Sequence, residues 1–479
     1  MKIVFFTEAG TNIGYGHLTR CYSFFQAFEH KGFQPLLIVK SDVVLDTIVD
    51  SPNIQLFDWH SKVEETKSIL NDTDIAIFDT YLVSPDLLVE YSANVKLPVF
   101  IDDFLRLQYP RGIVFNGAIG AECLPFPFNN QVEYILGASF QPVRSDFWNS
   151  LKRQHNERIQ RIFLTVGGND IHGILPVLVD EILKFGYEIE VVCGNNEKMK
   201  QWVEQKNQSS LRAHFNLSAT QMRQLMYACD IAVSAAGQTL YELAATGLPT
   251  IAFSVADNQQ TNLEGWTNAG FVFNAGNCKN SDFLSQINIK LKEIENIERR
   301  KESSKCGQTI VTGNGGLAAI NAILKNFTQK NLYLRKADES DIDAVYLLSN
   351  DVTVRAQSFN QEKIEYENHV RWFRNKLIDE NCLFLICTLG NTFAGQVRYQ
   401  VEGDKAIIGI SIESKFRGFG LGEQMLVHSR KMFQENFPKV SAIIAHVKHD
   451  NPASGRMFEK AGYKQVENSE NLEYRFILK

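Results

Sequence analysis

The chain lacks most of the features that mark secreted, membrane-bound or nucleic-acid-binding proteins. None of its 8 cysteines forms a Cys-x-x-Cys pair, so buried free thiols in a reducing cytoplasm are expected. Only 12 prolines occur in 479 residues, which fits a packed protein rather than a disordered one. The 49 basic and 55 acidic residues give a net charge of −6, which argues against a nucleic-acid partner.

Long apolar runs are missing as well. No segment approaches the length of a transmembrane span, and the apolar start at residues 1–6 is too short for a signal peptide. We therefore expect a cytoplasmic protein with no membrane partner. The hydrophobic content of 44% is enough to build cores, and a chain of 479 residues should divide into two or three domains.

Short apolar runs alternate with helical stretches from the start of the chain, as buried parallel strands and their covering helices do. The first series of runs is 3–6, 35–39, 75–78, 99–101, 112–115 and 133–136. After the polar segment 149–157, a second series is 161–166, 189–192, 213–217, 231–233, 249–253 and 271–273. We predict an α/β fold with two Rossmann-like domains, 1–150 and 151–328, and a ligand cleft between them.

The last third of the chain has a different pattern. A charged helix over 290–304 and a helix near 317–325 close the second domain, and polar residues 326–331 suggest a linker. Beyond it, the runs 383–388, 392–400 and 406–412 follow one another so closely that hairpins must join them. Residues 331–479 are therefore predicted to form an α+β domain with an antiparallel sheet.

The most informative motif is the stretch 13–20, which contains Gly14, Gly16 and His17 and follows the first apolar run. A strand, a glycine-rich turn and a helix bring backbone N–H groups close to a phosphate or sugar. His17 would begin the helix, whose partial positive charge disfavours imidazolium, so a neutral histidine acting as a base is predicted. The alternative is a tight turn whose histidine only caps the helix.

Three segments of the second domain suit a nucleotide diphosphate and a sugar. Two are small-residue turns at strand ends, where free N–H groups could hold the diphosphate, and Glu242 could accept ribose hydroxyls or merely stabilise its helix. The third is a run of amides that suits sugar hydroxyls or N-acetyl groups, although an ordinary polar loop would look the same. The residues are Gly167, Gly168, Asn169 and Asp170, then Gly237, Gln238, Thr239 and Glu242, then Asp257, Asn258 and Gln259.

Together these motifs resemble the UDP-sugar hydrolases of pseudaminic acid biosynthesis, which are related to GT-B glycosyltransferases. The resemblance covers about residues 1–325. It implies hydrolysis of UDP-2,4-diacetamido-2,4,6-trideoxy-β-L-altropyranose with inversion, with His17 activating water and Tyr81 and Asn258 as catalytic companions. It further implies UDP contacts by the 167–169 and 237–242 residues and sugar contacts by the glycines of the 13–20 motif with Asp257 and Gln259. Asp102 and Asp103 match an acidic pair of unassigned role.

No metal is expected in this reaction, because UDP is a good leaving group. Helix N-termini can stabilise its growing charge, and a positioned water can attack the sugar. Asp72 and Asp74 form an Asp-x-Asp pair, but it precedes a strand and is interpreted as a solvated loop. Asp341 and Asp343 are better explained as residues at the start of a helix.

A second glycine-rich motif lies in the last domain. Arg417, Gly420 and Gly422 form Arg-x-x-Gly-x-Gly between a strand and an amphipathic helix over 423–437, which is the layout of a pyrophosphate cradle. With Asn451 and the following segment to Tyr463, residues 331–479 resemble the GNAT N-acetyltransferases. The resemblance implies acetyl-CoA as cosubstrate, bound by Ile412, Ser414, Arg417, Gly418, Gly420, Gly422 and Asn451.

One position departs from the GNAT pattern. Phe458 stands where relatives often carry a tyrosine that protonates the thiolate, so water or a residue such as Tyr463 must replace it. Glu413, His446 and His449 are candidate bases for the amine. Segments 350–355, 358–359 and 369–373 resemble enzymes that acylate amino groups of nucleotide-linked sugars.

The sequence therefore predicts a bifunctional enzyme that N-acetylates a UDP-linked 4-amino sugar and then hydrolyses the UDP-sugar. Two alternatives stay open: a GT-B glycosyltransferase that uses a UDP-sugar donor, and a GNAT domain that only binds coenzyme A or mediates assembly. UDP release without an added acceptor separates the first from a hydrolase.

Overall fold

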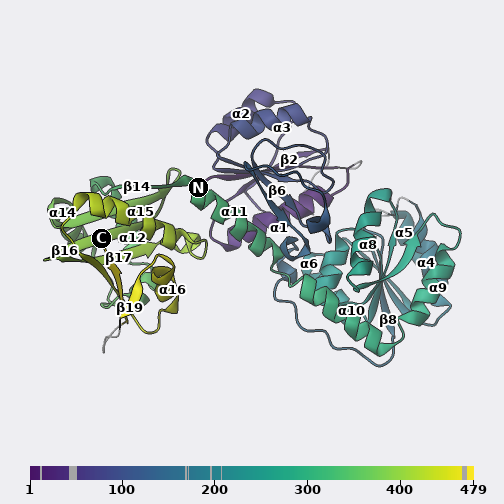
Figure 1. Cartoon of the computed structure of the whole chain (residues 1–479). Helices are drawn as coiled ribbons and strands as arrows, with labels where there is room; N and C mark the ends of the chain where they lie inside the picture. The colour runs from purple at the N-terminus through teal and green to yellow at the C-terminus, as the bar shows by residue number, and fades with distance from the viewer. Residues whose placement is uncertain are drawn as a thin grey trace. The chain divides into compact units, whose positions relative to one another are not determined.

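The computed structural model of the chain describes residues 1–10, 13–42, 51–167, 170, 172–194, 197–206, 208–466 and 472–478. Within these residues the strands form three sheets (Figure 1). The chain divides into two compact units, Lys2–Ile320 and Asn321–Lys479, the latter joined by Met1. The first unit contains two of the sheets, and the predicted domain limits at 150 and 328 stay predictions.

The first sheet has the strand order β3-β2-β1-β4-β5-β6-β7, and its pairings are parallel, as predicted. Its inner strand β1 is buried at every position because it is flanked by strands on both edges and covered on both faces. The short strand β3 was not predicted, since its residues are largely exposed. The strands are β1 (Ile3–Ala9), β2 (Leu36–Ser41), β3 (Ile54–Leu56), β4 (Ile75–Asp79), β5 (Leu97–Ile101), β6 (Gly112–Asn116) and β7 (Val132–Leu136).

Helix α1 (Gly16–His30) is the helix predicted after the glycine-rich turn, and it packs against β1. The rings of Phe25 and Phe28 lie 6.3 and 6.0 Å from that of Phe5. Two shorter helices, α2 (Val63–Asn71) and α3 (Pro85–Ala93), belong to the same half. The α3 helix begins sharply because the Ser84 side chain accepts a hydrogen bond from the backbone of Leu87.

The second sheet has the order β10-β9-β8-β11-β12-β13 and is also parallel, with one apolar core on each face. Its strands are β8 (Arg161–Thr165), β9 (Glu188–Cys193), β10 (Leu211–Phe215), β11 (Ile231–Ala235), β12 (Thr250–Ser254) and β13 (Val272–Asn277). Its helices are α4 (Ile174–Leu183), α5 (Glu197–Lys206), α6 (Ala219–Ala228), α7 (Thr239–Thr246), α8 (Gln260–Asn268), α9 (Phe283–Glu293) and α10 (Ile297–Ile310).

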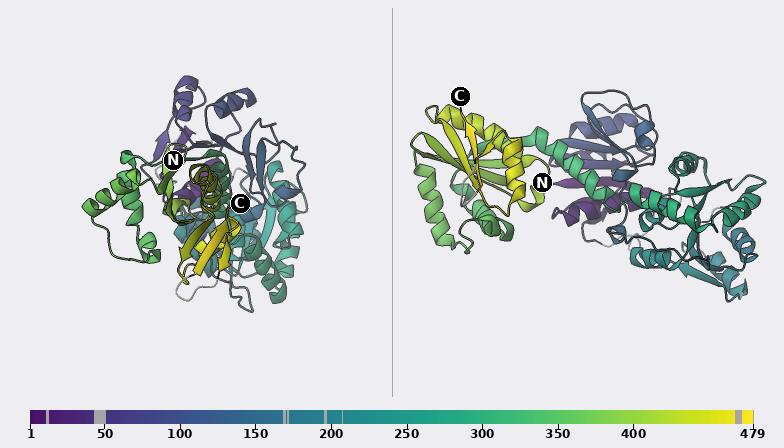
Figure 2. Two further views of the ribbon diagram at one scale, coloured as in Figure 1. Left: turned by 60° about the vertical axis from the view of Figure 1, so that its left-hand side comes forward. Right: turned by 60° about the horizontal axis from the view of Figure 1, so that its bottom comes forward.

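Two predictions about the end of this unit are wrong. The charged helix expected over 290–304 is split between α9 and α10, because the Asn296 side chain caps a new helix by accepting from the backbone of Glu298 and Arg299. The polar segment 326–331 is not a linker loop but the end of α11 (Gly315–Asn331), an unbroken helix in Figures 1 and 2. Its polar side chains Asn326 and Thr328 are buried, which sequence polarity alone does not reveal.

The third sheet has the order β14-β15-β16-β17-β18-β20-β19. The predicted hairpins are present, but the sheet is mixed rather than antiparallel, because β17 and β18 pair in parallel. Its strands are β14 (Leu332–Lys336), β15 (Cys382–Leu389), β16 (Thr392–Glu402), β17 (Lys405–Ile412), β18 (Ala442–Val447), β19 (Lys464–Val466) and β20 (Leu472–Ile477). Its helices are α12 (Ile342–Ser349), α13 (Val352–Gln357), α14 (Tyr366–Ile378), α15 (Leu421–Asn436) and α16 (Pro452–Lys460).

The segment that connects the two parallel sheets is held by a buried arginine. Arg153 donates to the backbone carbonyls of Thr246, Cys229 and Met226 at 3.0, 2.9 and 2.6 Å. Burial and the nearby positive charges of Arg153 and Arg300 lower the pKa of His155 to about 4. His155 is therefore neutral in the folded protein at neutral pH.

We expect this histidine to make folding stability depend on pH. Because its folded pKa lies below the ordinary value of about 6.5, the unfolded chain binds the extra proton first, and stability falls as the pH drops from about 6.5 towards 4. Partial exposure limits the contribution to about 1–2 kcal/mol. Thermal unfolding of His155→Gln should lose this part of the pH dependence, whereas parallel losses in both proteins would contradict the assignment.

Candidate functional site

The predicted histidine lies at the start of α1 and is held by a carboxylate that the sequence motif does not include. His17 is the second residue of the helix, and its Nδ1 lies 2.7 Å from Oδ1 of Asp79, the last residue of β4. Asp79 is fully buried, and 12% of the His17 side chain is exposed. With Nδ1–H donated to the carboxylate, Nε2 is the nitrogen left to accept a proton.

Asp79 stays ionised in this buried position because Arg20 neutralises it. Arg20 donates from Nε and Nη2 to the two carboxylate oxygens at 2.9 and 2.8 Å. Burial alone would raise the pKa of Asp79, but the charge of Arg20 and the hydrogen bonds from His17 and Arg20 outweigh it and hold that pKa well below its usual range. Arg20 lies three residues after His17, on the same side of the helix, so one helical turn presents both partners to Asp79.

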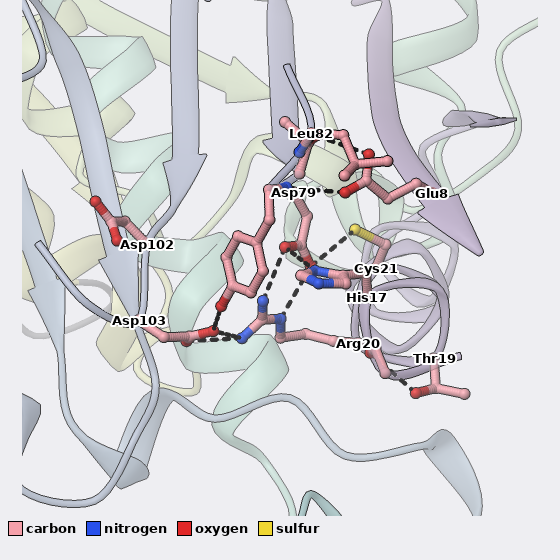
Figure 3. Close-up of polar contacts among 12 residues, drawn as sticks. Glu8, His17, Thr19, Arg20, Cys21, Asp79, Leu82, Asp102 and Asp103 are labelled. Atoms are coloured by element: carbon pink, nitrogen blue, oxygen red, sulfur yellow. Dashed lines mark hydrogen bonds and ion pairs between the residues drawn. The ribbon is translucent and has the colours of Figure 1, made fainter. Parts of the chain in front are cut away.

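Arg20 also joins this pair to a second carboxylate and a tyrosine. Its Nη1 donates to both oxygens of Asp103 at 2.8 and 2.9 Å, and the Tyr81 hydroxyl donates to the same carboxylate at 2.6 Å. The Tyr81 and His17 rings meet edge to face, with centroids 4.5 Å apart. Figure 3 shows Asp103 pointing into this network and Asp102 turned away from it. Two of the three predicted catalytic residues therefore lie in contact.

The charges of this cluster suit a histidine that gains a proton during a reaction. Asp79 and Asp103 contribute two negative charges against the single positive charge of Arg20. Burial and the charge of Asp103 raise the pKa of Tyr81, so its hydroxyl stays protonated at neutral pH. A proton taken up at Nε2 of His17 completes the charge balance. The helix N-terminus and the buried Asp79 carboxylate have opposite electrostatic effects at His17, and its role as a base stays a prediction.

Two further residues fix Tyr81. Its backbone N–H donates to Oε1 of Glu8 at 2.8 Å, and the Thr80 hydroxyl donates to the other oxygen of the same buried carboxylate. Arg106 places its guanidinium 4.3 Å from the centre of the Tyr81 ring. Asp102, by contrast, accepts from the backbone of Phe104 and from the Tyr109 hydroxyl, so it stabilises the loop after β5 instead of joining the cluster.

The glycines of the first motif leave open space beside His17. Gly14 has a φ of +77° and exchanges two backbone hydrogen bonds with Gly10. A Cβ atom at Gly14 or Gly16 would meet no other atom within 4 Å. Steric crowding by neighbouring residues therefore does not explain why both positions are glycine. The sugar contacts assigned to these two residues stay a prediction.

In the second half, the predicted diphosphate turns lie at strand ends. Gly167 follows β8 with a φ of +94°, whereas Gly168 and Asn169 lie outside the described residues. Gly237 and Gln238 connect β11 to α7, which begins at Thr239. Oε1 of Gln238 accepts from Nε2 of Gln141 at 2.7 Å, so this turn is tied to the segment that follows β7. Diphosphate contact at these residues stays a prediction.

Glu242 already has a protein partner. Its two carboxylate oxygens accept from Nε and Nη2 of Arg144 at 2.7 and 2.8 Å, and only 12% of its side chain is exposed. The sequence offered no signal for this pair, since Arg144 lies 98 residues earlier in the chain. The ribose contact predicted for Glu242 is not tested by this geometry.

The residues of the predicted amide run, 257–259, differ in their exposure and in their hydrogen bonds. Gln259 accepts from the backbone of Val255 at 3.0 Å, and its Nε2 lies 3.7 Å from the point where a Cβ atom of Gly237 would stand. Asp257 and Asn258 are exposed. The described contacts do not connect Asn258 to His17 or Tyr81, so its predicted catalytic role stays a prediction.

The expected pyrophosphate cradle of the last domain has the predicted strand, loop and helix. Gly418 and Gly420 have φ values of +92° and +78°, and a Cβ atom at either would meet nothing within 4 Å. A Cβ atom at Gly422 would lie 2.3 Å from Sδ of Met457, so this glycine is required by the packing of α15 against α16. Ser414, just after β17, is exposed. Coenzyme A contacts at these residues stay a prediction.

The Arg417 side chain is not directed freely into this loop. It donates from Nε to the carbonyl of Ile412 at 2.8 Å and from Nη2 to Asp351 at 3.2 Å, and it also bonds Thr353. Asp351 caps α13, so Arg417 joins the loop before α15 to the start of that helix. A role through the backbone of this residue is compatible with these bonds.

The sheet opens between β17 and β18. The two strands pair only from Lys405 to Ile407 and from Ala442 to Ile444, while β17 continues to Ile412 and β18 to Val447. Asn451, predicted at the position where the strands separate, lies beyond β18 and caps α16 by accepting from the backbone of Ser454 at 3.1 Å. The opening leaves backbone groups on both strands free to bind an extended ligand.

Tyr463, predicted as one replacement for the missing tyrosine hydroxyl, lies next to Phe458, and its role as proton donor stays a prediction. Its side chain is buried against the rings of Phe458 and Phe476, at centroid distances of 5.1 and 5.3 Å, and burial raises its pKa well above the usual value. His446 and His449 are exposed and Glu413 is partly buried. The roles of these three residues as bases stay predictions.

The part of the chain that the structure describes contains no group of three or more His, Cys, Asp or Glu residues able to hold a metal ion. Asp74 of the predicted solvated pair is in fact buried and accepts from the backbone of Lys2 and from Nζ of Lys96. Across the same described ranges, the search for a long apolar helix that could cross a membrane finds none.

Comparison with known proteins identifies residues 331–464 as an acetyltransferase (GNAT) domain. An uncharacterised protein of Methanocaldococcus jannaschii is 21% identical over 511 aligned residues, which cover 99% of each chain. The pseudaminic acid cytidylyltransferase and UDP-2,4-diacetamido-2,4,6-trideoxy-beta-L-altropyranose hydrolase of Helicobacter pylori is 21% identical over 61% of this chain and 50% of its own. The UDP-2,4-diacetamido-2,4,6-trideoxy-beta-L-altropyranose hydrolase of Campylobacter jejuni is 21% identical over 45% of this chain and 77% of its own.

Among solved structures, the spermidine N-acetyltransferase of Vibrio cholerae in complex with CoA and spermine is similar to 31% of this chain and 96% of its own. The sequence identity is 14% and the TM-score is 0.29. The chain thus combines a GNAT domain with similarity to UDP-sugar hydrolases of pseudaminic acid synthesis.

Proposed function

We propose that the chain is a bifunctional enzyme of pseudaminic acid synthesis. Its GNAT domain transfers an acetyl group from acetyl-CoA to the 4-amino group of a UDP-linked sugar. Its two parallel α/β sheets, arranged as in GT-B enzymes, then hydrolyse UDP-2,4-diacetamido-2,4,6-trideoxy-β-L-altropyranose to the free sugar and UDP. The hydrolase relatives support the second reaction, and the GNAT domain supports the first.

The observation that carries the hydrolase proposal is the pair of His17 and Asp79 beside open space. Nε2 of His17 accepts a proton from water as the water oxygen bonds to the anomeric carbon, and the bond from that carbon to the UDP oxygen breaks with its electron pair. Asp79 fixes the tautomer and stabilises the imidazolium that forms. Tyr81 borders the same space, and the partial positive charge at the start of α7 stabilises the departing diphosphate.

In the GNAT domain, the thioester lies in the opening between β17 and β18, with the pyrophosphate against the turn at Gly418 and Gly420. The amine nitrogen bonds to the thioester carbonyl carbon and releases a proton to water, the carbon–sulfur bond breaks with its electron pair, and the coenzyme A thiolate takes up a proton. Since Phe458 carries no hydroxyl and Tyr463 is buried, water is the proton donor in this proposal.

The experiment that tests both reactions is mass spectrometry of the products formed from a UDP-4-amino-4,6-dideoxy sugar, with and without acetyl-CoA. We expect an N-acetylated free sugar and UDP with acetyl-CoA present, and no added acceptor should be needed for UDP release. UDP that appears only with an added sugar or lipid acceptor would overturn the hydrolase proposal in favour of a glycosyltransferase. Bound coenzyme A without acetyl transfer would overturn the transferase proposal.

A further inference from the structure

Arg398 of β16 is a partly buried cation without an anionic partner among the described residues. Its guanidinium carbon lies 4.8 Å from the centre of the Trp372 ring on α14. Within the described residues its guanidinium makes no hydrogen bond or ion pair, and burial lowers its pKa. No Arg398 nitrogen is among the buried unpaired side-chain atoms of the described residues, so the guanidinium reaches solvent and can meet an anion that arrives from outside the protein.

On the same strand, one neighbour of Arg398 also has a polar atom without a hydrogen bond among the described residues, whereas the other neighbour is fully bonded. Two residues earlier, Oε1 of Gln396 is buried and accepts no hydrogen bond in the described part of the chain. Two residues later, Gln400 is satisfied, since its Oε1 accepts from Lys376 at 2.6 Å and its Nε2 donates to Asp379 at 3.1 Å. Residues two apart on a strand share one face, so Gln396 and Arg398 present an unused acceptor and an unused cation side by side.

Next to Arg398, strand β17 leaves room for a ligand to extend towards the opening between β17 and β18. Gly409 of β17 is the residue paired with Arg398, and paired residues project to the same face. A Cβ atom at Gly409 would meet nothing within 4 Å. Gly409 also lies two residues beyond Ile407, where β17 and β18 stop pairing. A ligand anchored at Arg398 can therefore lie over Gly409 and reach the opening.

We propose that Arg398, held in plane by Trp372, binds the diphosphate of the nucleotide-linked sugar that the GNAT domain acetylates. A guanidinium presents two parallel N–H groups that match two phosphate oxygens, and stacking on an aromatic ring restricts its orientation. The sugar then extends over Gly409 and brings its amine to the thioester. This inference rests on the proposed acetyltransferase and adds the part of the substrate that the domain recognises.

The proposal fixes the order of the two reactions. Hydrolysis removes the diphosphate, which is the group that Arg398 holds, so the released sugar is a poor acceptor. Acetylation of the UDP-linked sugar therefore precedes hydrolysis, and a free amino sugar that has already lost UDP is not recovered by the GNAT domain.

The first test compares two acceptors in a His17→Gln background, which prevents hydrolysis during the assay. Arg398→Gln should raise the KM for the UDP-4-amino sugar by about 10- to 100-fold, as expected for losing a charged hydrogen-bonded pair. The KM for acetyl-CoA and the slow acetylation of the corresponding free 4-amino sugar should not change. Arg374→Gln is the matched control, because Arg374 is exposed and paired with Glu339 on the same domain.

The second test needs no acetyl transfer. Titration of the full chain with UDP in the presence of coenzyme A should reveal two binding sites, one in each enzymatic part, and Arg398→Gln should retain only one. Two sites in the variant, or equal losses for the linked and the free sugar, would overturn the anion site. Failure of the wild-type protein to acetylate any amino sugar, with two UDP sites present, would overturn the acetyltransferase and leave the anion site standing.

Discussion

Replacing His17 by glutamine should lower UDP release by about three orders of magnitude, within the range that positioned general bases contribute. Glutamine fills a similar volume and can still donate to Asp79, but its side chain has no nitrogen able to take a proton from water. The measurement is UDP formation from the diacetamido substrate at saturating concentration. Coenzyme A release from the GNAT domain should not change, since that domain lies in the other compact unit.

Two companion variants separate a base from a merely structural histidine. His30 lies in the last turn of the same helix and is exposed, so His30→Gln should leave UDP release unchanged. Asp79→Asn keeps the shape of the site but replaces an ionised acceptor with an amide that can donate to Nδ1, which favours the wrong tautomer. UDP release by His17→Gln at more than a tenth of the wild-type rate would contradict the assignment of His17 as the base.

The sequence predicted the positions of the site residues better than it predicted which of their side chains pair with one another. His17 could be predicted because it follows a buried strand and a glycine-rich turn, whereas Tyr81 was expected only from the resemblance to UDP-sugar hydrolases. Arg20 belongs to the motif of residues 13–20 but Asp79 does not, and their pairing joins residues 59 apart and depends on how α1 lies against β4. Glu242 and Arg144 are a second case, since neither their spacing in the sequence nor their residue types predict that the two side chains form an ion pair.

The same limit applies to the fold. Strands such as β1 are apolar on both faces, so their positions follow from the sequence, and α1 follows from its apolar stripe. The end of α11 does not, because Asn326 and Thr328 look like linker residues until tertiary packing buries them. Arg417 is comparable: the motif suggests a phosphate ligand, and only the fold brings Asp351, 66 residues away, to its guanidinium.

These buried pairs change how the first motif is understood. A glycine-rich turn with a histidine is compatible with phosphate binding, yet the carboxylates of Asp79 and Asp103 make this end of the sheet unfavourable for a phosphate. Among the described residues, Arg20 is the cation bonded to both acids, and each of its guanidinium nitrogens donates to one of them. We therefore propose that the motif faces the neutral sugar and its attacking water and that the second half binds the diphosphate.

Replacing Gly420 by glutamate should have the second large effect, a loss of acetyl-CoA affinity of at least about 100-fold with UDP release unchanged. Gly420 has a φ of +78°, where a residue with a Cβ atom costs about 1–2 kcal/mol, so the turn shifts away from the conformation that the cradle needs. The new carboxylate also stands where the proposed pyrophosphate lies and repels it. The measurement is coenzyme A binding to the full chain by calorimetry, together with the KM for acetyl-CoA.

Gly403 provides the control that separates strain and charge from position. It lies in the turn between β16 and β17 with a φ of +65°, and a Cβ atom there would also meet nothing within 4 Å. Gly403→Glu therefore adds the same charge and a similar backbone cost away from the proposed cradle, and it should leave coenzyme A binding intact. Equal losses in the two glutamate variants would mean that the domain is merely destabilised. Retained affinity in Gly420→Glu would remove the pyrophosphate from this turn, because a carboxylate and a diphosphate cannot share one set of backbone N–H groups.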